Sequence, residues 1–242
     1  MAKFLSVNHM KDLFFDLDHT LWDFEKNSIE ALNEGYAELS LFSFGVESAE
    51  NYISNYKKAN AWCWGEYQAG RMQKAELRWR RFSMTLENWG LENDTVLGER
   101  LGAHYVETSP YKTHLVKDAL KVVEELHERG HRLIMLTNGF EEVQHIKVRQ
   151  CGLEPFFESV LTSDALGVKK PHPEIFNLAL KKTNSKVEDA IMLGDSLESD
   201  IIGARDAGWG QVYYNPNSIP HNENVLHEVK DLNSILDLPL RK

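Results

Sequence analysis

The chain has 242 residues, of which 37 are acidic and 27 basic, so that its formal net charge is −10. Hydrophobic residues make up 42% and charged residues 26%, a mixture typical of a folded globular protein and not of a disordered or membrane-spanning one. The negative charge argues against a nucleic-acid polymer as the main partner, because such partners are bound by clustered lysines and arginines.

The first ten residues contain no continuous apolar core of the kind found in a signal peptide, and no later apolar run is long enough to span a bilayer. The two cysteines, Cys63 and Cys151, cannot form a disulfide framework in a chain of this length. We therefore expect a cytoplasmic protein with buried thiols and no membrane partner, either a monomer or a small homo-oligomer.

The first predicted element is a buried strand, because residues 13–17 form a short, mostly apolar run. The pattern then changes to long amphipathic stretches without proline, which predict helices at residues 28–39, 49–67, 74–89 and 94–107. Pro110 ends this region. We expect residues 23–108 to form an all-helical cap domain that is inserted after the first strand.

Helices and strands alternate after Pro110. Helical patterns are found at residues 116–129, 141–151, 173–183 and 197–207, and strand patterns at residues 132–136, 159–162, 190–193 and 211–214. Strands separated by single helices indicate right-handed βαβ crossovers and a parallel sheet. The sequence therefore predicts an α/β fold, with residues 1–22 and 109–242 forming a doubly wound, Rossmann-like core.

Acidic and hydroxyl side chains follow the predicted strands, where ligands bind in such sheets. Asp16 and Asp18 end the first strand and project from the same side, because they are two residues apart in an extended chain. Thr137 ends a second strand, and Asp195 ends another. Three converging carboxylates repel one another unless a divalent cation lies among them, and oxygen ligands alone favour a hard ion such as Mg²⁺.

These residues resemble the four sequence motifs of the haloacid dehalogenase superfamily. The motifs are Asp16-x-Asp18-x-Thr20, Thr137, Lys170 before Pro171-x-Pro173, and Gly194-Asp195-x-x-x-x-Asp200. They occur in the expected order, and the resemblance covers the whole chain, including the helical insert. Within the superfamily the chain is most similar to bacterial pyrimidine 5′-nucleotidases, through the segments at residues 20–24, 66–71 and 137–140.

The resemblance implies a phosphatase mechanism. Asp16 would be the nucleophile that attacks phosphorus, and Asp18 the general acid and base. Thr137, the backbone N–H of Asn138 and the ammonium of Lys170 would bind the transferring oxygens. Magnesium would be held by Asp16, Asp195 and the backbone carbonyl of Asp18, while Asp200 would orient Lys170 or a metal-bound water from further out. The lysine is taken as Lys170 and not Lys169, because it directly precedes Pro171.

The expected function is thus the hydrolysis of a small phosphorylated metabolite, with a 5′-nucleotide as the leading substrate. A 2-haloacid dehalogenase would use the same nucleophile without a metal, but it would lack Asp18. A phosphosugar mutase keeps both aspartates and resembles the chain less in the cap. A non-catalytic binding module on an inherited scaffold would tolerate the loss of Asp16 or Asp195, and both are present.

Gln68 and Arg71 are expected in a short connection between two cap helices. Their amide and guanidinium groups are suited to hydrogen bonding with the edge of a base, which makes them candidates for reading the leaving group. The same connection is equally consistent with an ordinary solvated loop.

Overall fold

A computed structural model of the chain describes residues 11–240. The interpretation of the first ten residues, and the outer ends of the predicted core domain, lie outside the described residues. Cys63 and Cys151 are both buried. No helix among residues 11–240 is long and apolar enough to cross a membrane.

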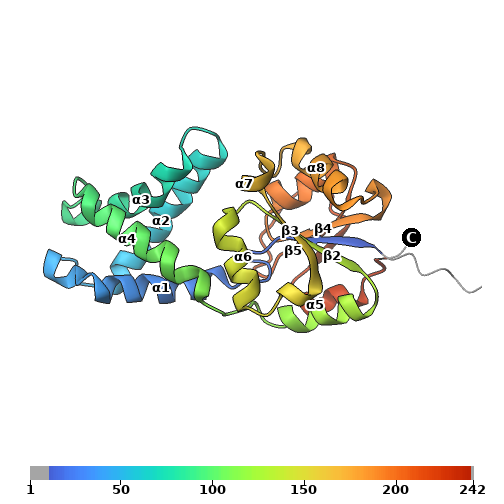
Figure 1. The fold of residues 1–242 in the computed structure, drawn as a ribbon, viewed down its shortest axis with the longest axis horizontal. Helices are drawn as coiled ribbons and strands as arrows, with labels where there is room; N and C mark the ends of the chain where they lie inside the picture. The colour runs from blue at the N-terminus through green and yellow to red at the C-terminus, as the bar shows by residue number, and fades with distance from the viewer. Residues whose placement is uncertain (1–10, 241–242) are drawn as a thin grey trace, which may run out of the picture. The chain divides into compact units, whose positions relative to one another are not determined.

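Residues 11–240 contain a sheet of six parallel strands in the order β3-β2-β1-β4-β5-β6. The doubly wound α/β fold expected from the sequence is confirmed (Figure 1). The strands are β1 (Asp12–Phe15), β2 (Arg132–Thr137), β3 (Phe157–Thr162), β4 (Ala190–Gly194), β5 (Gly210–Tyr214) and β6 (His227–Val229). The last of these was not predicted, because three residues are too few to show a period.

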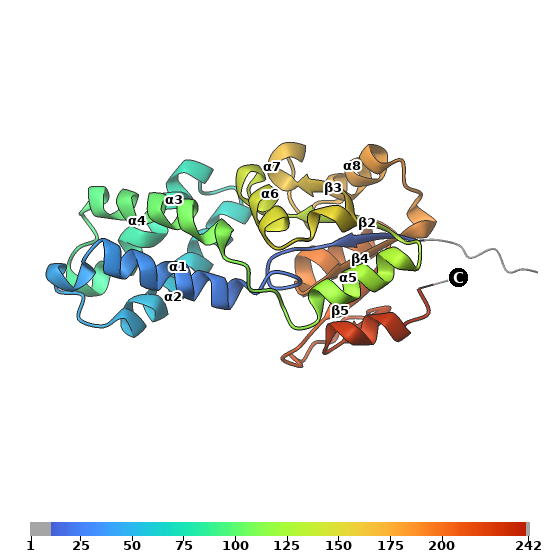
Figure 2. The same ribbon diagram turned by 60° about the horizontal axis from the view of Figure 1, so that its bottom comes forward.

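Helices cover both faces of this sheet. On one face, Leu13 and Phe15 pack in one core cluster with Val122, from α5 (Ala119–Glu128), and Val148, from α6 (Glu141–Gln150). On the other face, Phe14 packs in a second cluster, which also contains side chains from α8 (Pro173–Thr183) and α9 (Gly203–Asp206). Figure 2 shows α5 and α8 on opposite sides of the strands. Successive side chains of β1 therefore point to opposite faces of the sheet, and each face packs against its own layer of helices.

The predicted helix at residues 197–207 is not a single α-helix. It begins as a π-helical turn, Leu197–Ile202, and continues as α9, Gly203–Asp206. The side chain of Ser196 accepts the backbone N–H of Ser199 at the start of the turn, and the turn contains the buried Asp200. Single π-helical turns of this kind often occur at functional sites.

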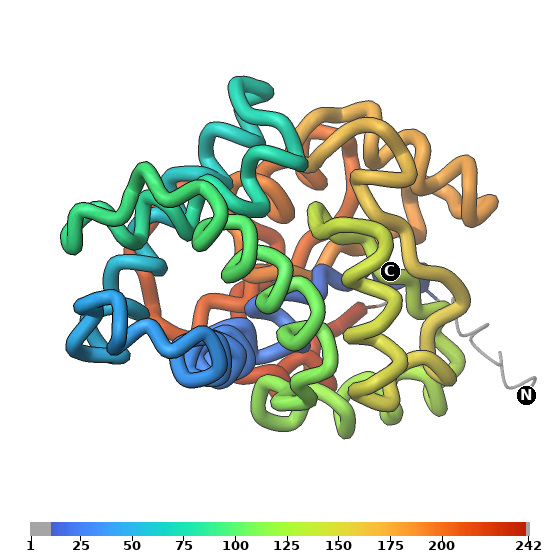
Figure 3. The backbone as a smooth tube through the Cα atoms, turned by 60° about the vertical axis from the view of Figure 1, so that its left-hand side comes forward, coloured from blue at the N-terminus to red at the C-terminus, as the bar shows by residue number. Residues whose placement is uncertain are grey.

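The second compact unit comprises Glu25–Lys112. Its helices are α1 (Phe24–Glu38, whose first residue belongs to the sheet unit), α2 (Ala49–Gln68), α3 (Lys74–Thr85) and α4 (Thr95–Thr108), all of which can be followed in Figure 3. Ser48 and Asp94 cap α2 and α4 by accepting backbone N–H groups with their side chains. The prediction that α3 continues to residue 89 was wrong: the chain passes into a short 3₁₀ turn, Glu87–Trp89, and reverses at Gly90 with φ of 68°.

The core of this helical unit is built around aromatic rings. Tyr56, Phe82 and Tyr105 surround the guanidinium carbon of Arg81 at 4.9–5.8 Å from the ring centroids. The backbones of α3 and α4 approach closely, because Gly102 leaves room for the carbonyl of Arg78. The division between the units lies two to four residues from the boundaries expected at residues 23 and 108.

Candidate active site

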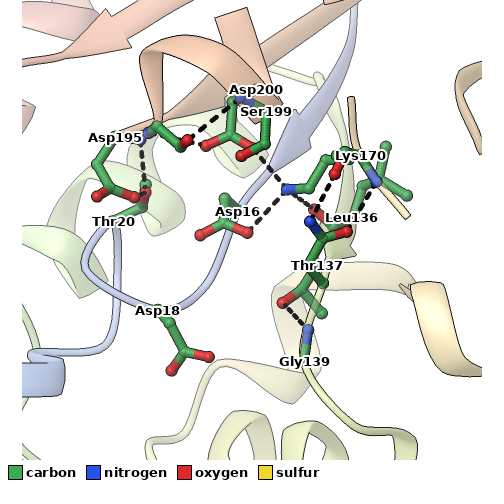
Figure 4. Close-up of polar contacts among 12 residues, drawn as sticks. Asp16, Asp18, Thr20, Leu136, Thr137, Gly139, Lys170, Asp195, Ser199 and Asp200 are labelled. Atoms are coloured by element: carbon green, nitrogen blue, oxygen red, sulfur yellow. Dashed lines mark hydrogen bonds and ion pairs between the residues drawn. The ribbon is translucent and has the colours of Figure 1, made fainter. Parts of the chain in front are cut away.

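The acidic and hydroxyl residues predicted from the sequence lie together at the carboxyl edge of the sheet. Asp16 follows β1, Thr137 ends β2 and Asp195 follows β4, and these three strands are neighbours in the sheet. The backbone N–H of Asp16 donates to the carbonyl of Leu193 at 2.9 Å, which continues the strand pairing to the point where the site begins. Figure 4 shows their side chains at this edge.

Lys170 lies at the centre of the site and is buried. Its Nζ is 2.8 Å from Oδ1 of Asp16, 2.7 Å from Oδ1 of Asp200 and 2.6 Å from the carbonyl oxygen of Leu136. The ammonium group donates hydrogen bonds to Asp16 and to the carbonyl of Leu136, and it forms an ion pair with Asp200. Burial alone would lower the pKa of Lys170, but the charges of Asp16 and Asp200 raise it to about 12. The lysine is therefore held in its charged form.

Asp200 reaches Lys170 because Gly194 has no side chain. A Cβ atom at position 194 would lie 2.2 Å from Oδ2 of Asp200. The same Oδ2 accepts the backbone N–H of Ser196 at 3.0 Å, which fixes the carboxylate in the turn after β4. Asp200 contacts the ammonium of Lys170 directly, as Figure 4 shows.

Asp195 is held by Thr20. The hydroxyl of Thr20 donates to Oδ1 of Asp195 at 3.1 Å and accepts the backbone N–H of Asp195 at the same distance. Oxygen atoms of Asp16, Asp195 and Asp200 all lie within 4.8 Å of one another. Burial, together with the charge of Asp200, raises the pKa of Asp195 to about 6. Negative charge at this edge is therefore costly without a further cation.

The pKa of Asp16 is raised well above its ordinary value. Burial is the largest cause, repulsion from Asp200 and Asp195 adds to it, and Lys170 opposes it only in part. Three carboxylates therefore lie close together, and the ammonium of Lys170 contacts two of them, Asp16 and Asp200. Their oxygen atoms, in this number and spacing, fit a hard divalent cation such as Mg²⁺.

The carboxylate of Asp18 points away from Asp16 in Figure 4, although the residues are two apart. Its Oδ1 lies 2.5 Å from Nζ of Lys147, and its Oδ2 accepts from Nε2 of Gln144 at 2.8 Å. Burial would raise the pKa of Asp18, but the ion pair and hydrogen bonds from Lys147 and Gln144 bring it below its ordinary value. The expectation that Asp18 shares an orientation with Asp16 was wrong, because α6 attracts its carboxylate.

Thr137 and Asn138 extend the site along β2. The hydroxyl oxygen of Thr137 accepts the backbone N–H of Gly139 at 3.1 Å. The side chain of Asn138 accepts the N–H of Lys170 at 2.8 Å and donates to its carbonyl at 2.9 Å. This pair of bonds ties the end of β2 to the loop that carries the lysine. It is the ammonium of Lys170, and not that of Lys169, that contacts Asp16.

Gln68 and Arg71 belong to the helical unit. Gln68 is the last residue of α2 and not part of the connection, whereas Arg71 lies in the connection that follows. The guanidinium of Arg71 forms two hydrogen bonds with Glu66, at 2.8 and 2.6 Å. Both Gln68 and Arg71 are exposed. These two bonds use two of the five N–H donors of the guanidinium, so three remain for another partner.

Sequence reasoning missed Gln144 and Lys147, both buried on α6. A signal was present in the spacing. Gln144 precedes Val148 on α6 by four residues and Cys151, which directly follows α6, by seven, and both of these residues belong to the core cluster of the sheet. A polar side chain within a buried apolar stripe calls for a partner. The partner here is the site itself.

A family model of haloacid dehalogenase-like hydrolases matches residues 10–208 of the chain. Pyrimidine 5′-nucleotidase PynA of Streptococcus pneumoniae is 30% identical over 94% of both chains. Pyrimidine 5′-nucleotidase YjjG of Escherichia coli is 28% identical over 91% of this chain and 96% of its own length. A glyceraldehyde 3-phosphate phosphatase of Pyrococcus abyssi is 30% identical over 85% of this chain and 81% of its own.

Solved structures show the same architecture. The crystal structure of the putative hydrolase YfnB from Bacillus subtilis, described as bound to magnesium and as revealing interdomain movement, is 27% identical. It superimposes with a TM-score of 0.83 over 94% of this chain and 97% of its own. A dehalogenase structure, 20% identical, has a TM-score of 0.72 over 98% of this chain and all of its own. At that identity the likeness concerns the fold alone.

Proposed function

The chain belongs to the haloacid dehalogenase-like hydrolase family, and from this premise we propose that it is a magnesium-dependent phosphomonoester hydrolase working through an aspartyl-phosphate on Asp16. The observation that supports the proposal is the convergence of Asp16, Asp195 and Asp200, two of which contact the ammonium of Lys170. A further acid, Asp18, lies two residues from the nucleophile. Nucleophile, cation site and acid–base group are the parts that phosphoryl transfer requires.

Asp16 and Asp195, with the backbone carbonyl of Asp18, are the groups proposed to hold Mg²⁺. The raised pKa values of Asp16 and Asp195 support this assignment, because each carboxylate lacks enough positive charge beside it. Bound Mg²⁺ would offset the negative charge of the substrate phosphate and of the two carboxylates. Asp200 is the carboxylate that holds Lys170 in place, since its Oδ1 is 2.7 Å from the ammonium.

Each step of the proposed reaction is assigned to side chains or backbone groups of the chain. An oxygen of Asp16 attacks phosphorus, and the bond from phosphorus to the leaving oxygen breaks. Lys170, the hydroxyl of Thr137 and the backbone N–H of Asn138 bind the oxygens of the transferring group and stabilise its charge. Asp18 must first take up a proton, because its contacts with Lys147 and Gln144 favour the ionised form. It then gives this proton to the leaving oxygen and afterwards takes one from the attacking water, which frees Asp16 and inorganic phosphate. For these steps the ion pair between Asp18 and Lys147 must open.

The proposed substrate is a 5′-nucleotide, with pyrimidine nucleotides first. Two relatives that span almost the whole chain are named pyrimidine 5′-nucleotidases. Another relative is named glyceraldehyde 3-phosphate phosphatase, so sugar and triose phosphates belong in the same comparison. In the proposed enzyme the sheet unit binds the phosphate that all these esters share, and the helical unit, through Gln68 and Arg71, distinguishes the leaving groups.

The test is the release of inorganic phosphate from a panel of nucleoside 5′-monophosphates, sugar phosphates and glyceraldehyde 3-phosphate. We expect the highest kcat/KM for a pyrimidine 5′-monophosphate, loss of activity with a chelator, and recovery with added Mg²⁺. Activity that is unchanged by the chelator would contradict the metal assignment. Transfer of phosphate to a second sugar hydroxyl would indicate a mutase, and halide release from a 2-haloacid would indicate a dehalogenase.

A further inference from the structure

Gln144 lies fully buried beside two residues of the proposed machinery, and the proposed mechanism gives it no role. Its Nε2 is 2.8 Å from the hydroxyl oxygen of Thr137 and 2.8 Å from Oδ2 of Asp18. An amide nitrogen has two hydrogens, so each of the two contacts uses one of them. A charged carboxylate only accepts hydrogen bonds, which requires that the nitrogen of Gln144, and not its oxygen, faces Asp18.

This arrangement determines which way the hydroxyl of Thr137 points its proton. The oxygen accepts from Nε2 of Gln144 at 2.8 Å and from the backbone N–H of Gly139 at 3.1 Å. A hydroxyl oxygen has two lone pairs and one hydrogen, and both lone pairs are now used. The O–H of Thr137 is therefore left to donate to a further acceptor. A phosphoryl oxygen is such an acceptor.

The neighbourhood of Gln144 is built to keep this amide in place. A Cβ atom at position 139 would lie 1.8 Å from Nε2 of Gln144, so glycine at that position makes room for the amide. Lys147, one turn along α6, pairs with Oδ1 of Asp18 and lies 3.9 Å from the ring centroid of Trp22. The Oε1 atom of Gln144 is buried without a hydrogen-bond partner among the described residues. Burying an amide oxygen without a hydrogen bond costs free energy, which indicates that the side chain is present for its two N–H donors.

We propose that Gln144 is a positioning residue that fixes the hydroxyl of Thr137 as a hydrogen-bond donor towards the transferring phosphoryl group and links it to Asp18. The inference rests on the proposed phosphatase function. It adds to that function a residue that touches neither substrate nor metal and acts through Thr137 and Asp18. Gln144 is thereby the common partner of the group that binds the phosphoryl oxygens and the group that transfers the proton.

Two nearly isosteric substitutions separate the donor role from simple packing. Gln144→Met keeps the length of the side chain and removes both donors. We expect it to lower kcat by about 10- to 100-fold, with KM changed by less than about 3-fold, because the hydroxyl proton is no longer directed in the transition state. Gln144→Glu has acceptors in place of donors, so it takes the proton of Thr137 for itself and repels Asp18. It should lower kcat more than Gln144→Met does.

The matched controls are Gln150→Met and Gln150→Glu, because Gln150 is exposed at the end of the same helix. Both should keep the wild-type kcat. Thermal unfolding of all four variants shows which of them retain the fold, and if Gln144→Glu does not fold, Gln144→Met and the cycle below decide. The wild type and Asp16→Asn are assayed alongside: an inactive wild type, or an active Asp16→Asn enzyme, overturns the proposed function itself.

A double-mutant cycle with Thr137→Val shows whether Gln144 acts through the hydroxyl. Valine keeps the shape of threonine and removes the hydroxyl oxygen. The fold loss of kcat caused by Gln144→Met should therefore be at least about 3-fold smaller in the Thr137→Val enzyme than in the wild type. The inference is overturned if Gln144→Met keeps kcat within about 2-fold of the wild type. It is equally overturned if the loss is the same with and without the hydroxyl, or if Gln144→Glu is the more active of the two.

Discussion

At the scale of single residues, the site is governed by an imbalance of charge. Lys170 is shared between Asp16 and Asp200, while Asp195 has a hydroxyl, Thr20, as its partner. Lys147 is taken up by Asp18 and does not offset the other three carboxylates. A group of carboxylates with this deficit either holds protons or binds a cation, which is why the metal requirement is the first property to test.

We predict that Asp195→Asn raises the Mg²⁺ concentration needed for half-maximal activity by at least about 10-fold, because the change removes one negative ligand. The concentration of Mg²⁺ that raises the thermal unfolding temperature should increase in parallel, which measures binding without catalysis. Asp206→Asn, which changes an exposed carboxylate on α9, is the control and should leave both values unchanged. An Asp195→Asn enzyme with a wild-type Mg²⁺ requirement would remove Asp195 from the metal site.

The principal site residues could be predicted from the sequence, because each of them follows a strand or stands in a motif of recognised spacing. Asp16, Lys170, Asp195 and Asp200 do lie together. The orientation of Asp18 could not be predicted, since it depends on two side chains of a helix that is more than 120 residues away in sequence. Contacts at such a separation follow only from the packing of α6 on the sheet.

At the scale of elements, the hydrophobic pattern and the residues that end helices and strands were sufficient to predict most of these elements. The buried apolar runs of β1, β2 and β4 and the amphipathic period of α2 and α8 were predicted to within two residues. The short strand β6 and the changes of helix type could not be predicted. The π-helical turn at Leu197–Ile202 depends on contacts that its own sequence does not show. Asp200 within it is fixed by the end of β4 and by Lys170.

The close packing of α3 against α4 gives a prediction about the helical unit. A Cβ atom at Gly102 would lie 2.5 Å from the backbone carbonyl oxygen of Arg78, and a backbone atom cannot rotate away. We expect Gly102→Ala to destabilise this unit by about 1–3 kcal/mol through overpacking. Hydrogen exchange in peptides from α3 and α4 measures the effect within the unit itself.

The control for this substitution is Gly65→Ala in α2, where an added Cβ meets no atom within 4 Å. Because alanine is the better helix former, this variant should gain about 0.5–1 kcal/mol. If Gly102→Ala exchanges as slowly as the wild type, the two helices can separate at little cost, and the close contact contributes little to the unit.

The end of α2 and the connection that follows it give a prediction about specificity. Gln68→Ala and Arg71→Ala should change the ranking of nucleotide substrates and have much less effect on para-nitrophenyl phosphate, which lacks a base to contact. Arg71 has only an exposed ion pair with Glu66 to give up, and such pairs are weak. Arg100→Ala, an exposed arginine on α4, is the control. An unchanged ranking in both variants would mean that the connection does not read the leaving group.

At the scale of the whole molecule, a chain with a net charge of −10 must bind an anionic substrate against its own overall field. The buried ammonium groups of Lys170 and Lys147 are each paired with carboxylates of the site. In the proposed enzyme, attraction of the phosphate would therefore depend on a local cation and on donors such as Thr137. The sheet unit contains Lys170, Lys147 and Thr137.

In the proposed mechanism Asp16 carries the phosphoryl group between two steps. The most direct measurement is rapid acid quenching of the enzyme during turnover of a nucleotide labelled in its phosphate, followed by digestion and identification of the labelled peptide. We predict that the label lies on Asp16 in the presence of Mg²⁺, and that Asp16→Asn, freed of any deamidated protein, is folded, unlabelled and inactive. Rapid phosphate release without labelled protein, or label on a residue other than Asp16, would contradict the account.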